Sequence, residues 1–117
     1  MGHAYLTTTE AAAVIGCSRW TLSRRIHAGE LATLHVLPTL RRVEARAVSL
    51  DAPPPIPGDL PALIDTTWLA RHWRMHRYTA QRLARDGWIP ASMREGRWVM
   101  PRAVFAAFIR THTVGGT

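Results

Sequence analysis

Residues 6–31, LTTTEAAAVIGCSRWTLSRRIHAGEL, align without a gap on residues 64–89, IDTTWLARHWRMHRYTAQRLARDGWI. Seven of the 26 aligned positions are identical. A repeat of this kind has to be interpreted before the chain is assigned to a single fold. It predicts two units of about 50 residues, each of which buries only a small core on its own. The identical positions include Arg19 with Arg77, Thr21 with Thr79, Arg24 with Arg82 and Gly29 with Gly87.

Each copy has the pattern of two helices joined by a short turn. Thr7 and Glu10 form a capping box before an alanine-rich segment, and Asp65 can cap the second copy. Gly16 predicts a left-handed end to the first helix. Arg74 takes its place in the second copy, so we expect another turn geometry there. The second helix of each copy should end at the shared glycine.

A hairpin is predicted after each helix pair. Residues 91–94 and 97–100 flank a Glu-Gly pair, and residues 33–36 and 41–43 flank a turn that contains Pro38. A closing helix is expected over residues 103–109, where the first copy has only a stub at 46–50. The predicted fold class is mainly α with small β wings.

The predicted organisation has four parts. Residues 1–50 form the first unit, and residues 62–110 form the second. Residues 51–61 contain five prolines and are expected to form an extended linker. Residues 111–117 are expected to be a flexible tail.

Charge points to a polyanion as the partner. The chain carries a net charge of +7, and all 15 of its basic residues are Arg. Arginine offers a planar fork that suits phosphates and guanine edges. Nine of these arginines lie in residues 62–117, so the second unit is predicted to be the stronger electrostatic anchor.

The sequence contains few features that would support other classes of function. Cys17 is the only cysteine, so no intrachain disulfide can form, and no apolar run reaches membrane-spanning length. His72 and His76 have a zinc-like spacing but lack a third ligand nearby. We expect neither an enzyme nor a metal or cofactor site, and we expect a cytoplasmic protein.

The order of these elements resembles the excisionase-like, MerR-type winged helix-turn-helix family. The resemblance covers both copies, strongest at the helices of the first and the wing of the second. It implies two tandem winged helix-turn-helix units and a DNA-binding protein of phage or mobile-element type, associated with the nucleoid of a bacterial host cell. The residues that carry it are Leu6-Thr7…Glu10-Ala11-Ala12…Gly16-Cys17-Ser18-Arg19…Thr21…Arg24…Gly29-Glu30-Leu31, Thr79…Arg82…Gly87-Trp88-Ile89-Pro90 and Arg97-Trp98-Val99-Met100-Pro101-Arg102-Ala103-Val104.

Within this family the resemblance favours an excisionase, a recombination directionality factor that steers an integrase. The alternatives are a transcriptional repressor or immunity-type regulator and, from another class, a protein-binding adaptor or inhibitor. The expected partners are double-stranded DNA, together with an integrase or further copies of the chain along the DNA. The linker and the equal order of the units predict a direct repeat of about ten base pairs as the site.

The DNA-contacting residues are predicted on the second helices and the wings. A helix fits the major groove and its first residues reach base edges, whereas wing arginines reach phosphates or the minor groove. The helix candidates are Ser18, Arg19, Trp20, Thr21, Ser23 and Arg24, and His76, Arg77, Tyr78, Thr79, Gln81 and Arg82. The wing candidates are Arg41, Arg42, Arg94 and Arg97.

Overall fold

The computed structural model describes residues 2–116, and the chain divides into two compact units. Unit 1 consists of Met1–Pro55 together with His112–Thr117, and unit 2 consists of Ile56–Thr111. The division therefore falls inside the proline-rich segment that the sequence marks as a linker. Met1 and Thr117 lie outside the described residues.

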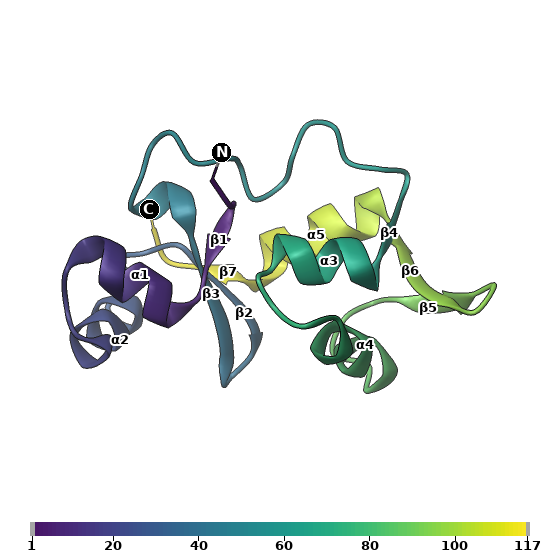
Figure 1. The fold of residues 1–117 in the computed structure, drawn as a ribbon, viewed down its shortest axis with the longest axis horizontal. Coiled ribbons are helices and arrows are strands. Elements are labelled where there is room, and N and C mark those ends of the chain that lie inside the picture. Colours follow the sequence, from purple (N-terminus) through teal and green to yellow (C-terminus); the bar gives the residue numbers. More distant parts are fainter. Residues whose placement is uncertain (1, 117) are drawn as a thin grey trace. The chain divides into compact units, whose positions relative to one another are not determined.

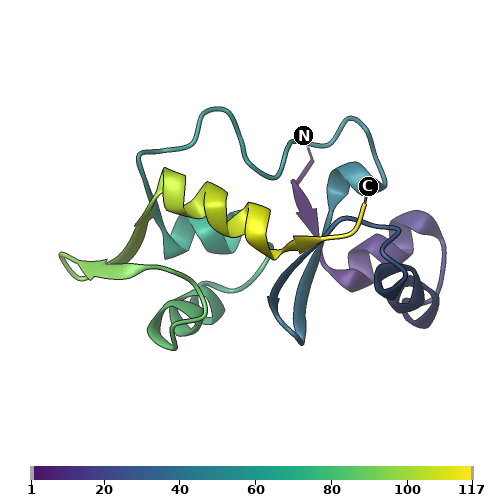
Figure 2. The same ribbon diagram turned by 180° about the vertical axis from the view of Figure 1, so that it is seen from behind.

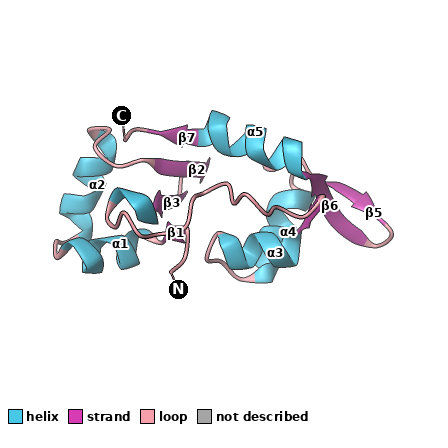
Figure 3. Cartoon of the chain, turned by 90° about the horizontal axis from the view of Figure 1, so that it is seen from above, coloured by secondary structure: helices cyan, strands magenta, loops and turns pink. Residues whose placement is uncertain are grey.

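Unit 1 contains two helices and a four-stranded antiparallel sheet with the order β1-β3-β2-β7 (Figures 1 and 3). The chain begins with a short strand, passes through both helices and continues into a hairpin and a 3-10 turn. Its elements are β1 (Tyr5–Leu6), α1 (Thr8–Ile15), α2 (Arg19–His27), β2 (Thr33–Leu37), β3 (Leu40–Glu44), η1 (Ala45–Ala47) and β7 (Thr113–Val114).

Unit 2 repeats the same order with a three-stranded antiparallel sheet, β4-β6-β5. Its closing helix α5 is longer than η1 and packs against α3, as the view from behind in Figure 2 shows. The elements are β4 (Leu63–Asp65), α3 (Thr66–His72), α4 (Arg77–Arg85), β5 (Ser92–Arg94), β6 (Arg97–Pro101) and α5 (Arg102–His112).

The predicted fold class, mainly α with small β wings in two tandem winged helix-turn-helix units, is wrong. The described chain is 41% helix and 22% strand, which makes it a mixed α/β protein with two antiparallel sheets. The additional strand arises because the residues before each first helix pair with the hairpin. Leu6 lies opposite Val43 in unit 1, and Ile64 lies opposite Met100 in unit 2. The hairpins are therefore parts of sheets.

The C-terminal segment, expected to be a flexible tail, forms the fourth strand of unit 1. In β7, Val114 lies opposite Thr33 of β2, and the backbone N–H of Gly116 donates to the carbonyl of Gly29 at 2.9 Å. Gly116 has φ +73°, and a Cβ there would lie 2.6 Å from the Cβ of Ala32. Backbone groups of residues 113–116 therefore find hydrogen-bond partners in unit 1.

The predicted helix caps are confirmed. The backbone N–H of Thr7 donates to Glu10 Oε1 at 2.9 Å, and that of Glu10 donates to Thr7 Oγ1 at 3.1 Å. In unit 2, Asp65 Oδ1 accepts from the backbone N–H of Trp68 at 2.8 Å. Each first helix therefore begins at the residue that the sequence marks.

The turn after the first helix has the same geometry in both units, against our expectation for Arg74. Gly16 has φ +82°, and Arg74 has φ +58°, so both residues are left-handed. The backbone N–H of Cys17 donates to the carbonyl of Ala12 at 3.0 Å, and the backbone N–H of Met75 donates to the carbonyl of Ala70 at 2.9 Å. These equivalent hydrogen bonds close both turns, and the arginine tolerates a backbone that costs it about 1–2 kcal/mol.

Separate apolar clusters lie beneath the helices of the two units. In unit 1 the cluster contains Ala11, Ala12, Leu22, Ile26, Leu31 and Val43, with Cys17 packed against it. In unit 2, Trp73 is fully buried and its ring stacks on Phe105 and Phe108. Trp88, by contrast, is 51% exposed.

The segment predicted as a linker is only partly a connector. Residues 51–61 adopt turns and bends, but Leu60 is buried and its carbonyl accepts from Arg102 Nη1 at 3.2 Å. The second half of the segment therefore packs on unit 2. Within residues 2–116, no helix has both the length and the apolar character needed to cross a bilayer.

Candidate nucleic-acid interface

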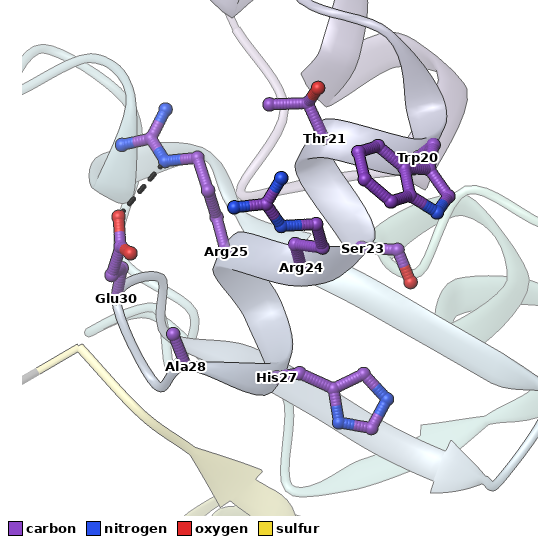
Figure 4. Close-up of a pocket in the computed structure, with 8 residues that line it drawn as sticks. All are labelled: Trp20, Thr21, Ser23, Arg24, Arg25, His27, Ala28 and Glu30. Atoms are coloured by element: carbon purple, nitrogen blue, oxygen red, sulfur yellow. Dashed lines mark hydrogen bonds and ion pairs between the residues drawn. The ribbon is translucent and has the colours of Figure 1, made fainter.

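Helix α2 presents an exposed aromatic residue and an arginine that is stacked on it. Trp20 is 68% exposed, and the guanidinium carbon of Arg24 lies 4.9 Å from the centre of its ring (Figure 4). Ser18 is the N-cap: its hydroxyl accepts from the backbone N–H of Thr21 at 3.1 Å and donates to Thr21 Oγ1 at 3.0 Å. Ser18 and Thr21 are thus engaged in starting the helix, whereas Trp20 and Arg24 face outward.

A pocket of about 460 Å³ lies along this face of α2 (Figure 4). Besides the predicted residues it contains Arg25, His27 and Glu30, which sequence reasoning missed. Arg25 Nε donates to Glu30 Oε1 at 3.1 Å, so its charge is already balanced by a carboxylate. The run of basic residues after Arg24 was the available signal for Arg25 and His27. The pocket is lined by Trp20, Thr21, Ser23, Arg24, Arg25, His27, Ala28 and Glu30.

A second hollow of about 380 Å³, which we call the unit 1 groove, joins three elements. Thr8 comes from the start of α1, and Arg41 comes from β3 of the hairpin. The remaining lining residues, Arg19, Trp20 and Ser23, come from α2. The structure therefore brings helix and hairpin candidates together around one surface that carries two arginines.

Unit 2 has a corresponding hollow of about 340 Å³, the unit 2 groove. It too is bordered by the start of the first helix, by the second helix through Gln81, and by the hairpin through Arg97. Its full lining is Asp65, Thr66, Thr67, Gln81, Met93, Gly96, Arg97 and Trp98.

Three lining positions are equivalent in the two grooves. Alignment of the helices pairs Thr8 with Thr66 and Ser23 with Gln81, and alignment of the hairpins on Val43 and Val99 pairs Arg41 with Arg97. Each pair belongs to a different element of its unit. The sequence repeat therefore also recurs on the surface: each groove is lined by an arginine of the hairpin and by a polar residue of the second helix.

Helix α4 begins with a stacked group of three side chains. His76 Nδ1 accepts from the backbone N–H of Tyr78 at 3.2 Å, and the two rings stack with their centres 4.9 Å apart. The guanidinium carbon of Arg77 lies 5.1 Å from the centre of the Tyr78 ring. Tyr78 is 58% exposed, and Arg82 is also exposed. Thr79 is half-buried on the same helix.

The hairpin arginines differ in how much of their charge is available. Arg97 Nη1 donates to Asp65 Oδ2 at 3.1 Å, so the carboxylate that caps α3 also balances an arginine of the unit 2 groove. Arg42 Nη1 donates to the carbonyl of Arg41 at 2.9 Å. Arg94 is exposed on β5 opposite Arg97, but it does not line the unit 2 groove.

His35 lies beside the basic edge of the unit 1 hairpin, opposite Arg41 in the β2–β3 register. Burial lowers the pKa of His35 below its usual value, and the nearby positive charges of Arg41 and His27 lower it further. The imidazole is therefore harder to protonate in the folded chain than in the unfolded chain.

Acidification should destabilise the protein through His35. Below the ordinary pKa of 6.5, the unfolded chain takes up a proton at this position more readily than the folded chain, so the free energy of unfolding falls as the pH falls. His35→Gln should reduce this slope, measured by urea unfolding at a series of pH values between about 5 and 7. Equal slopes in the two proteins would contradict the assignment.

Comparison of the chain with protein-family models, with curated proteins and with solved structures gives no match.

Proposed function

We propose that this protein binds double-stranded DNA through α2 and α4, each assisted by the hairpin of its own unit. The observation that carries the proposal is the repeated groove, in which Arg41 and Arg97 occupy equivalent hairpin positions next to the second helix. A helix of this kind fits the major groove, and a basic hairpin beside it can contact the phosphates that flank the groove. The net charge of +7 favours the same partner.

We further propose, on the family resemblance, that the DNA-binding role is that of an excisionase that directs an integrase. A repressor or immunity-type regulator is the alternative. Footprinting separates the two roles: the first predicts protected arrays beside integrase core sites, and the second predicts a protected operator at a promoter. Protection of neither kind of site would remove both roles.

Arg41→Ala tests the contribution of the hairpin to duplex binding. If Arg41 contacts a phosphate, the variant should weaken binding equally across sequences and reduce the slope of log affinity against log salt by about one. Arg110→Ala is the matched control, because it removes the same charge from an exposed position of α5 outside both grooves. Fluorescence anisotropy with a labelled duplex measures both quantities. Equal effects of the two substitutions would contradict a specific role for the groove.

A further inference from the structure

The two second helices hold different arginines against their exposed aromatic residue. Trp20 and Tyr78 occupy equivalent positions, as do Arg19 and Arg77, and Arg24 and Arg82. In unit 1 the stacked arginine is Arg24, one turn after the aromatic residue. In unit 2 it is Arg77, directly before the aromatic residue, and its Nη2 also donates to Tyr78 Oη at 3.4 Å.

The other arginine of each pair is left exposed. Within residues 2–116, the side chains of Arg19 and Arg82 make no hydrogen bond, ion pair or ring contact. Each helix therefore combines one guanidinium group that lies against a ring with one that is exposed and makes no such contact, and the two positions are exchanged between the units.

The N-cap residue also differs between the two helices. In unit 2 the cap is His76, and its ring stacks on Tyr78 at the start of the helix, next to Arg77. In unit 1 the cap is Ser18, whose small side chain is engaged with Thr21 and has no ring to stack on Trp20. The ring of Trp20 is instead contacted by Arg24 of the following turn.

We propose, building on the DNA-binding function above, that Arg24 in unit 1 and Arg77 in unit 2 are the residues that read guanine. Trp20 and Tyr78 act as positioning residues for them. A guanidinium group held against a ring retains N–H donors for the bidentate contact to guanine, although one donor of Arg77 is shared with Tyr78 Oη. It also loses less side-chain freedom on binding than an extended arginine. Arg19 and Arg82 contact phosphate, which tolerates a mobile charge.

The two reading arginines start from different helix positions but reach equivalent rings. Arg24 lies five residues further along its helix than the position equivalent to Arg77, which is about 7.5 Å along the helix axis. Both guanidinium groups nevertheless lie beside rings at equivalent positions, 4.9 Å and 5.1 Å from the ring centres. Each half-site should therefore show one guanine preference, which depends on Arg24 in one half-site and on Arg77 in the other.

Selection of bound duplexes from a randomised library, performed with the full chain, tests the assignment. Arg24→Ala should abolish one guanine preference and Arg77→Ala should abolish another, each with roughly a tenfold or greater loss of discrimination. The matched controls are Arg19→Ala and Arg82→Ala, which should keep both preferences and reduce the salt slope by about one. Loss of a guanine preference in either control would overturn the assignment.

The positioning role has its own test. Trp20→Leu should remove the guanine preference of Arg24 while the thermal midpoint stays unchanged, because Trp20 is exposed. Trp20→Phe keeps a ring and should restore the preference. If the protein binds duplexes in a salt-dependent manner but the two Trp20 variants do not give these results, only the present inference is wrong. If the protein does not bind duplexes at low salt, the proposed function is wrong as well.

Discussion

Raising the salt concentration from about 50 to about 200 mM should weaken duplex binding by roughly a thousandfold or more. If both units engage the DNA, the two second helices and the two basic hairpins together neutralise about six to ten phosphates. Each neutralised phosphate releases a counterion. A plot of log affinity against log salt, measured by fluorescence anisotropy, gives the slope. A slope as shallow as two or three would mean that only one unit binds.

A double variant shows which surface is responsible for the slope. Arg82→Ala combined with Arg94→Ala removes two exposed arginines from unit 2 and should reduce the slope by about two. The chain that carries Arg110→Ala alone should retain the full slope, because Arg110 is exposed on α5 away from the grooves. If each substituted arginine lowers the salt slope by the same amount in both proteins, the slope responds to net charge and not to a defined contact surface.

Local features of the fold could be predicted because their causes are local. A capping box such as Thr7 with Glu10 spans three residues, and the hairpin turn at Glu95 and Gly96 has positive φ at both positions, as an x-Gly pair requires. The repeat then extended these predictions from one unit to the other. The candidate residues on α2 followed from the same reasoning, since an arginine-bearing helix after a tight turn is visible in the sequence.

The sheet order could not be predicted, because it depends on partners far apart in the chain. Strand β7 has only two residues and no alternating pattern, and its partner β2 begins 80 residues earlier. The turn geometry at Arg74 was predicted wrongly because arginine disfavours a left-handed backbone. The hydrogen bond from the N–H of Met75 to the carbonyl of Ala70 nevertheless holds Arg74 in that conformation. The ion pair of Arg97 with Asp65 spans 32 residues and was likewise invisible in the sequence.

Trp73→Ala should unfold most of unit 2. Trp73 is fully buried, and its ring stacks on Phe108 with centres 5.8 Å apart and on Phe105 at 6.3 Å. Truncating a buried tryptophan to alanine costs about 3–5 kcal/mol, since the lost apolar contacts are accompanied by a cavity. A unit of this size has little more stability than that to lose.

Hydrogen exchange of the backbone amides measures the effect where it occurs. In Trp73→Ala the amides of α3, α4 and α5 should lose their protection, and the helical circular dichroism signal should fall. Trp88→Ala is the matched control: its side chain is 51% exposed, so we expect a change within about 1 kcal/mol and protected helices. Retained protection of α3 and α5 in Trp73→Ala would show that the aromatic cluster is not what holds these two helices together.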